Sequence, residues 1–342
     1  MKIFKQYYKY IIAIILLLGL LTYKNLREFN WGNWAKRTAK NLMEDARKND
    51  EKRQHDLANI KYSLVILIGN DYYKAWAYNC RGSNTHKKVR RSENEKYFKQ
   101  TLSDYDNAIK HTSNCYASAL GNKGLLYSKI GDLETAINYY NEAIQCNAKY
   151  QYAWENKTND LFDAKRYSEA IETGLQAIEK FGPNDDIYFD IAYSYEMLGN
   201  HKKAVEYYNK ELKMNNYKSW WTLTNASYCK LMLKDYDGAI EYALKSIRLW
   251  DRDVHPYNFV AFAAIKKRNL DLAIQYNNLA FNKAYKENYL TFYNYAYIKH
   301  LQGDNEGARQ RLEKARQLFA KDKETWQFEG FETLCDNLER KL

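Results

Sequence analysis

The chain of 342 residues contains very few residues that interrupt a helix. It has only two prolines and 14 glycines. Proline removes a backbone donor and clashes with the preceding helical turn, and glycine weakens a helix interior. So few of either residue over this length predict a nearly all-helical chain.

Cysteine is also scarce, and its spacing does not indicate a disulfide framework. The five cysteines form no Cys-x-x-Cys pair and are far apart: Cys80, Cys115, Cys146, Cys229 and Cys335. An odd, scattered set of this kind is more typical of core packing than of disulfides or of a metal site. We therefore expect these side chains to fill the core.

The sequence motifs of common catalytic sites are absent as well. The chain has no GxxxxGK[ST], GxGxxG, HExxH or GxSxG, which are the patterns of phosphate, dinucleotide, zinc and nucleophile sites. Its six histidines are scattered along the chain, so we expect them at the surface or in packing rather than as metal ligands. The sequence therefore predicts no cofactor, no metal and no enzymatic activity.

Charge is plentiful but of mixed sign, with 53 Lys and Arg against 42 Asp and Glu. The two signs are interspersed, which favours solubility over a nucleic-acid groove. One basic cluster stands out, Lys87, Lys88, Arg90 and Arg91, in a predicted loop that begins at Gly82. It could contact anionic lipid headgroups or an acidic partner, and a solvated, flexible loop is the simpler interpretation. Nucleic acid is not expected, because no aromatic residue interleaves with the cluster.

One long apolar run lies at the N-terminus. Residues 10–23 are uncharged and stand between Lys9 and Lys24. At about 1.5 Å per residue they span roughly 21 Å, less than the ~30 Å hydrocarbon core, although interfacial tyrosines and snorkelling lysines extend the reach. We predict an uncleaved signal anchor over residues 1–25, a single-pass membrane localisation and an extracytoplasmic remainder. A cleaved signal peptide and a buried helix are the alternatives.

The strongest pattern is a repeat with a period of 34 or 35 residues. One series of small residues has this period: Ala136, Ala170, Ala204, Ala239, Ala273 and Ala308. A second series lies twelve positions earlier: Gly124, Thr158, Ala192, Ser227, Ala261 and Ala296. Two series with one period indicate a unit of two short helices that approach closely at their small residues.

Turn and capping residues separate the two helices of each unit. Gly131, Gly199 and Gly303 are suited to a positive φ. Short polar residues follow as predicted N-caps, with Arg166 as the exception: Asp132, Asn200, Asp235, Asn269 and Asp304.

At these residues the chain resembles the tetratricopeptide repeat family. The period, the small residues, the Gly-Asp turn and a following aromatic such as Tyr140 or Tyr208 all match. The resemblance implies an all-α, right-handed superhelical solenoid of helix-turn-helix repeats. We place six repeats in residues 117–322, one or two degenerate repeats with the basic insert in residues 26–116, and a capping helix in residues 323–342.

The resemblance also implies a binding surface, because first helices line the concave face in this family. The corresponding positions predict a partner-binding set: Tyr152, Asn159, Phe189, Tyr193, Trp221, Tyr228, Asn258, Phe262, Tyr293 and Tyr297. Aromatic side chains offer a large contact area at low entropic cost. The same rings could instead plug a narrow superhelix.

Together these features predict a membrane-tethered scaffold or adaptor within a cell-envelope assembly. It would bind a protein or an extended peptide in its concave groove. The alternative is a cytosol-facing regulatory receptor that senses a peptide with the same groove.

Overall fold

The computed structural model describes residues 31–89, 95–113, 115–284, 286–322 and 328–342. These residues form seventeen helices and no strand, so the predicted all-α architecture is confirmed for the described part of the chain. The chain divides into two compact units, Met1–Asp132 with Gln145–Asn147, and Leu133–Ile144 with Ala148–Leu342. Each unit has its own packing and is described by itself.

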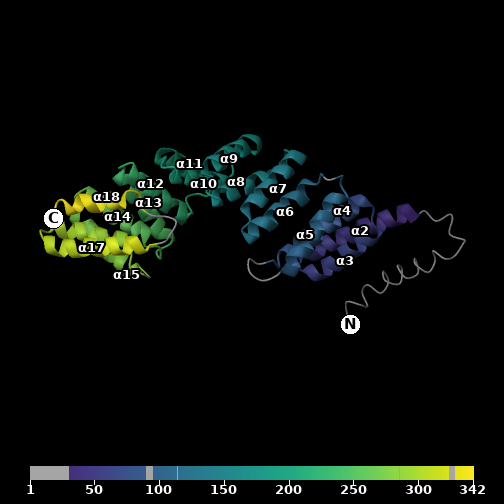
Figure 1. Ribbon diagram of the computed structural model, residues 1–342, viewed down its shortest axis with the longest axis horizontal. Helices are drawn as coiled ribbons and strands as arrows, with labels where there is room; N and C mark the ends of the chain where they lie inside the picture. The colour runs from purple at the N-terminus through teal and green to yellow at the C-terminus, as the bar shows by residue number, and fades with distance from the viewer. Residues whose placement is uncertain (1–30, 90–94, 114, 285, 323–327) are drawn as a thin grey trace, which may run out of the picture. The chain divides into compact units, whose positions relative to one another are not determined.

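The first unit contains five helices that pack in sequence order (Figure 1). They are α2 (Trp31–Glu51), α3 (His55–Ile68), α4 (Asp71–His86), α5 (Glu95–Lys110) and α6 (Ala117–Ile130). Met43, Tyr62 and Val65 are buried in the core that α2, α3 and α4 share. The core is small and largely aliphatic, and polar contacts supplement it.

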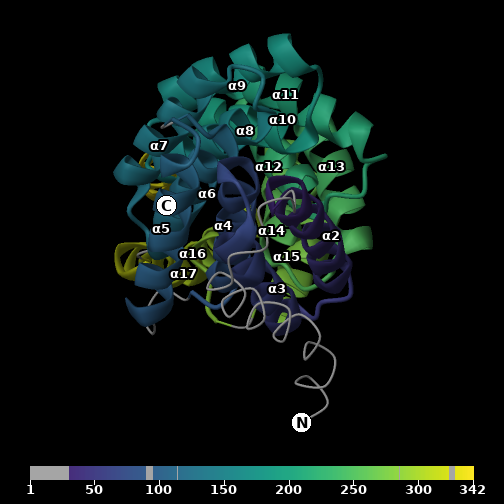
Figure 2. The ribbon, with the colours of Figure 1, turned by 90° about the vertical axis from the view of Figure 1, so that its right-hand side faces the viewer.

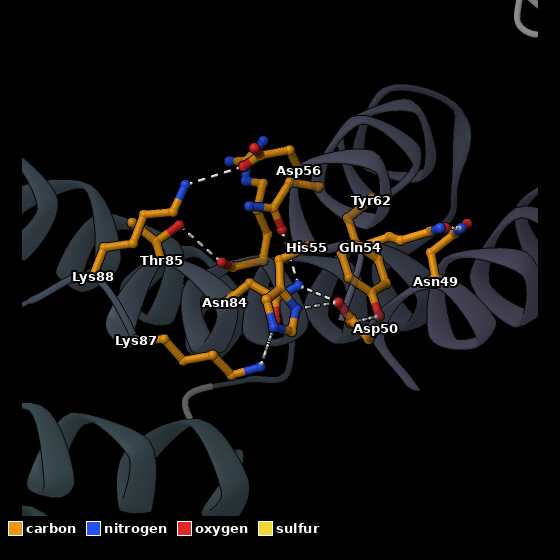
Figure 3. A network of polar contacts seen from close by, with 12 residues as sticks. Asn49, Asp50, Gln54, His55, Asp56, Tyr62, Asn84, Thr85, Lys87 and Lys88 are labelled. Carbon is orange, nitrogen blue, oxygen red and sulfur yellow. Dashed lines mark hydrogen bonds and ion pairs between the residues drawn. The ribbon is translucent and has the colours of Figure 1, made fainter. Parts of the chain in front are cut away.

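A polar network joins the ends of these three helices (Figure 3). Asp50, in the last turn of α2, accepts a hydrogen bond of 2.6 Å from the Tyr62 hydroxyl of α3. It accepts a second, also of 2.6 Å, from Nδ2 of Asn84 on α4, and it lies 3.2 Å from Nδ1 of His55. Because one carboxylate bonds groups from two other helices, it links all three helices.

Gly82 lies inside α4, where the sequence predicted the start of a loop. The loop prediction is wrong at this point because the helix continues to His86. A Cβ at Gly82 would lie 2.8 Å from Cε1 of Tyr105 on α5. Glycine is therefore required by the close approach of two helices rather than by a turn. Arg90 and Arg91 lie outside the described residues.

The second unit contains the other helices (Figure 1). They are α7 (Leu133–Cys146), α8 (Gln151–Asp163), α9 (Tyr167–Phe181), α10 (Asp185–Met197), α11 (His201–Met214), α12 (Trp220–Met232), α13 (Tyr236–Leu249), α14 (His255–Lys266), α15 (Leu270–Lys283), α16 (Tyr289–Leu301), α17 (Asn305–Lys321) and α18 (Phe331–Glu339).

Helices of the second unit pack as hairpins, and the hairpins stack. The pairs α8/α9, α10/α11, α12/α13, α14/α15 and α16/α17 are in contact, and so are the successive first helices α8, α10, α12, α14 and α16. Figure 2 shows α8, α10 and α12 on the inner side of this unit and α9, α11 and α13 on its outer side. We call the surface formed by the first helices the inner face.

Small residues at the helix contacts behave as the repeat predicts. From Ala136 to Ala308, every alanine of the first series is fully buried. In the second series, Thr158, Ala192, Ser227, Ala261 and Ala296 are also fully buried. The absence of large side chains at these points lets paired helices pack closely, which confirms the interpretation of the repeat.

Turns and caps also match the prediction. Gly131, Gly199 and Gly303 have φ of 90°, 73° and 84°. The side chains of Asn200, Asp235, Asn269 and Asp304 each accept a hydrogen bond from the helix that they precede. Arg166 precedes α9 without a capping bond, as expected for the exception.

Two of the cysteines form a disulfide, which corrects the prediction that all five fill the core. Cys115 and Cys146 are bonded, with their Cα atoms 5.4 Å apart and a sequence separation of 31. Cys229 and Cys335 are buried thiols, as predicted. Spacing alone could not find this pair, because the repeat brings together two residues that are far apart in sequence.

The predicted single-pass membrane localisation is contradicted. Within the described part of the chain, no helix is both long enough and apolar enough to cross a bilayer. Helix α2 has 21 residues but carries charged side chains along its length. Residues 10–23, where the anchor was predicted, lie outside the described residues. The extracytoplasmic placement was inferred from that anchor and is not supported either, whereas the cell-envelope setting stays a prediction.

Candidate peptide-binding surface

The end of the chain lies on the inner face of α12, α14 and α16. The ring of Phe328 is 5.5 Å from Tyr228 on α12 and 5.2 Å from Phe262 on α14. The ring of Phe331 is 5.6 Å from Tyr293 on α16. Residues 328–331 therefore occupy this part of the inner face.

Main-chain groups of the same segment are held by tyrosine hydroxyls. The backbone N–H of Phe328 donates to the Tyr289 hydroxyl at 2.9 Å. That of Glu329 donates to the Tyr228 hydroxyl at 3.1 Å, and the Glu329 carboxylate lies 2.8 Å from Nε2 of His201. The inner face thus satisfies both the backbone and the side chains of an inserted segment.

Four predicted partner-binding residues lie at this occupied end. Tyr228, Phe262 and Tyr293 are only 4%, 4% and 1% exposed because the terminal segment covers them. Tyr297 accepts a hydrogen bond from Lys341 at 2.9 Å. Partner binding by these four residues stays a prediction, and in this structure they contact the chain's own end.

Asn258 and Trp221 are separated from those rings. Asn258 is fully buried, and its Oδ1 accepts a hydrogen bond of 2.9 Å from the Thr291 hydroxyl, so it joins α14 to α16. Trp221 is 48% exposed and packs edge to face on Trp220, with ring centroids 5.3 Å apart. The structure does not bring either residue into the cluster around Phe328.

The remaining predicted residues lie together near the first repeats of this unit. Tyr152, Asn159 and Phe189 line a pocket of about 530 Å³ between α8, α10 and the start of α12. Tyr193 adjoins it, because its ring is 6.0 Å from Phe189 and 5.1 Å from Phe162, which also lines the pocket. The volume is within the range of about 300–1,000 Å³ that is usual for ligand sites.

Local capping positions the acidic side of this pocket. Asn184 precedes α10, and its Oδ1 accepts a hydrogen bond of 2.9 Å from the Ile187 N–H. Its Nδ2 donates to Oε1 of Glu155 on α8 at 2.9 Å. Asp185 and Asp186 occupy the first turn of α10, where the helix dipole favours negative charge. The cap therefore orders carboxylates from two helices around one opening.

Five carboxyl side chains line this pocket: Glu155, Asp185, Asp186, Asp190 and Glu211. Burial raises the pKa of Asp190 to about 7, although a hydrogen bond from Asn159 opposes the shift. Burial also raises the pKa of Glu211 to about 7; interactions with the Thr222 hydroxyl and the Asn215 amide oppose this shift, and repulsion from Asp185 and Asp186 adds to it. Burial raises the pKa of Tyr152 to about 12. The pocket therefore gathers five acidic groups, two of which are about half protonated near pH 7.

Comparison with protein families identifies the repeats around this pocket. Models of the tetratricopeptide repeat match residues 117–150 and residues 156–218. These segments are tetratricopeptide repeats. The matched segments contain α10, α11 and α8 from residue 156 onward, and these helices supply most of the pocket.

Two proteins of Methanocaldococcus jannaschii are similar in sequence to the chain. The TPR repeat-containing protein MJ1428 is 24% identical over 191 residues, which are 51% of this chain and 33% of that protein. The chain thus spans about a third of the length of this relative. The uncharacterized protein MJ0572 is 42% identical over 60 residues, which are 17% of this chain and 70% of that protein.

Two solved structures share the fold. YrrB, described as a TPR protein with an unusual peptide-binding site, has a TM-score of 0.50 and 16% identity, over 58% of this chain and 97% of its own. Pseudomonas aeruginosa PilF has a TM-score of 0.50 and 14% identity, over 71% of this chain and 99% of its own. At these identities the likeness concerns the fold, and it supports the helical-repeat solenoid.

The basic insert lies in the first unit, outside these matched repeats. Lys88 donates to Asp56 on α3 at 3.0 Å, and Lys87 donates to Asn84 on α4 at 3.1 Å (Figure 3). Lys88 is thus tied to α3 and Lys87 to the end of its own helix, α4, and a role for them in partner binding stays a prediction.

Sequence reasoning missed two groups of functional interest in the repeats. Glu211 was not found because it comes from a second helix, whereas only first helices were searched for binding residues. Phe328 and Phe331 were not connected with the inner face, because a terminal segment has no fixed place in the repeat pattern. In the described residues, no group of three His, Cys, Asp or Glu side chains is arranged to hold a metal ion.

Proposed function

We propose that the chain is a protein-interaction scaffold that binds an extended segment of a partner on the open part of its inner face. The open part comprises the pocket between α8, α10 and α12 together with Tyr193. It offers aromatic surface and polar groups to one extended chain, which is a common mode of peptide recognition.

One observation carries this proposal: the chain's own segment 328–331 already lies on the inner face of the later repeats. Tyrosine hydroxyls accept hydrogen bonds from its backbone N–H groups, and aromatic rings surround its phenylalanines. The inner face is therefore chemically able to hold a peptide. The peptide-binding site named for YrrB, which has a similar fold, supports the same use of this architecture.

A peptide library displayed on phage, selected against the full chain, tests the proposal. Selected peptides would be synthesised with a fluorophore and titrated by fluorescence polarisation. We expect Tyr152→Ala and Phe189→Ala each to weaken binding at least tenfold, since truncating a central aromatic residue costs roughly 1–2 kcal/mol or more.

The matched control is Glu172→Ala, at an exposed position of α9 on the outer side of the unit. It should leave the affinity unchanged, and circular dichroism should show that all variants are folded. A library that yields no binding peptide, or peptides whose affinity survives both aromatic substitutions, would refute the proposal.

A further inference from the structure

We infer that the pocket between α8, α10 and α12 binds one basic side chain, a lysine or an arginine, of the bound peptide. The inference rests on the proposed function and gives the chemistry of the partner. It stands on three features of the pocket: its charge, one incomplete hydrogen-bonding group, and its aromatic walls.

The charge of the pocket is opposite to that of the chain. Five carboxyl groups line it, and none of the described residues that line it is a lysine, arginine or histidine. The chain as a whole carries a formal charge of +11. An acidic hollow with no basic residue in its lining attracts a cation and disfavours an acidic peptide.

Glu211 is the incomplete group. Glu211 is 6% exposed, and its Oε1 accepts a hydrogen bond from Nδ2 of Asn215 at 2.5 Å. No hydrogen bond of ordinary length reaches its buried Oε2 among the described residues. The nearby Thr222 hydroxyl, which lowers the pKa of this carboxyl, is itself bonded to the Ser219 hydroxyl at 2.8 Å. A buried acceptor without a donor costs roughly 1–3 kcal/mol, so a ligand N–H that reaches Oε2 would recover that loss.

A basic side chain satisfies both the charge and the geometry. An ammonium or guanidinium group has several N–H donors and no acceptor, so it can bond Oε2 of Glu211 and a second carboxylate at once. The rings of Tyr152, Phe162 and Phe189 line the same pocket and can contact the apolar stem or the cation. A bare metal ion fits less well, because the described acids form no ligand group of three.

Binding of a cation should depend on pH. Asp190 and Glu211 both have a pKa of about 7 because they are buried, and Asp185, Asp186 and Glu155 face them from α10 and α8. Raising the pH from 6 to 8 ionises each group, so a ligand that needs one ionised carboxylate gains up to about tenfold in affinity. A neutral ligand gains nothing by this route.

The test uses the full chain and the peptides selected from the display library. Each peptide is compared with a copy in which one lysine or arginine is replaced by glutamine, at pH 6 and pH 8, by fluorescence polarisation. We expect selected peptides to be enriched in lysine or arginine, one replacement to weaken binding at least tenfold at pH 8, and arginine amide at millimolar concentration to compete.

Two variants of the protein locate the effect. Glu211→Gln keeps the size of the side chain, and Asp186→Asn changes an exposed residue, so little effect on stability is expected. Each should weaken the basic peptide at least fivefold and leave its glutamine copy unchanged. Glu206→Gln, on the exposed side of α11, is the control and should change neither.

The outcomes separate this inference from the proposed function. Selected peptides could lose affinity with Tyr152→Ala and yet show no preference for lysine or arginine and no response to Glu211→Gln or Asp186→Asn. That result would overturn the basic-side-chain site and leave peptide binding intact. Competition by norvaline amide as strong as that by arginine amide would also overturn it. Failure to select any peptide counts against the proposed function itself.

Discussion

Replacing Glu211 by glutamine should stabilise the protein at alkaline pH and not at acidic pH. The carboxyl group is buried on α11, and no hydrogen bond of ordinary length reaches its Oε2 in the described structure. Its pKa rises from 4.5 to about 7, chiefly because burial disfavours the ionised form. Glutamine removes the charge and keeps the size, so the change isolates the electrostatic effect.

The direction follows from proton binding. Between the unfolded pKa near 4.5 and the folded pKa near 7, the folded state binds more protons than the unfolded state. The free energy of unfolding therefore falls as the pH rises through this window, and it stays low above pH 7. A shift of this size corresponds to about 3 kcal/mol at roughly 1.36 kcal/mol per pKa unit.

The glutamine variant lacks this loss but introduces a buried amide. An unpaired amide N–H lowers stability by about 1 kcal/mol or more, so the net gain at pH 8 should be about 2 kcal/mol. At pH 5 the wild-type carboxyl is protonated in the folded state, and we expect no gain. Asp190, whose pKa is also about 7, is present in both proteins and cancels in the difference.

Urea unfolding at pH 5 and pH 8, followed by circular dichroism, measures the effect. Glu206→Gln on the same helix is the control, because Glu206 is exposed and its contacts with Lys203 and Lys210 lower its pKa. That variant should show no difference between the two pH values. An equal effect of Glu211→Gln at both pH values would refute the reasoning, since it would show that shape rather than charge decides.

Three further substitutions test the packing. Gly82→Ala should destabilise the chain by about 1–3 kcal/mol, because the new Cβ would meet Tyr105 at 2.8 Å, and thermal unfolding followed by circular dichroism measures this. Replacing Cys115 and Cys146 by serine should lower the free energy of unfolding by about 3–4 kcal/mol, because the disulfide closes a loop of about 30 residues and restricts the unfolded chain. Urea unfolding without reductant measures this loss. Phe331→Ala should cost about 3–5 kcal/mol, because the ring is 1% exposed among other aromatic rings, and the same urea titration measures it.

Each of these has its own control. Ser83→Ala, beside the glycine, should be nearly neutral, and equal losses for the two would contradict a steric cause. Reductant should destabilise the wild type and have no effect on the double serine variant. Thr333→Ala is exposed on α18, so a loss comparable with that of Phe331→Ala would show that the terminal helix, and not the ring, is responsible.

The hairpins of the second unit were predictable because their causes are local. An alanine such as Ala204 in every second helix, and a glycine or short polar residue before it, determine packing and turn within one unit. These features repeat, so each copy reinforces the interpretation of the others. The helix pairs and caps of the structure could therefore be expected without any knowledge of distant contacts.

The features that could not be predicted depend on contacts between residues far apart in sequence, or occur in one repeat and not in the others. Cys115 meets Cys146 only after the intervening helices have folded. Gly82 was taken as a loop residue, since nothing in the sequence shows that Tyr105 packs against it. Glu211 gains its interest from burial and a missing partner, and neither is visible in a pattern of residue types.

The same inner face carries two different chemistries, and this difference explains why one end is filled and the other is open. Around Phe328 the face is aromatic, so a phenylalanine-rich segment of the chain itself can bury apolar surface there. Near Glu155 and Glu211 the face is acidic, and residues 328–331, which occupy the aromatic end, contain no lysine or arginine. A lysine or arginine of a partner, as proposed above, would supply the charge that complements this acidic end.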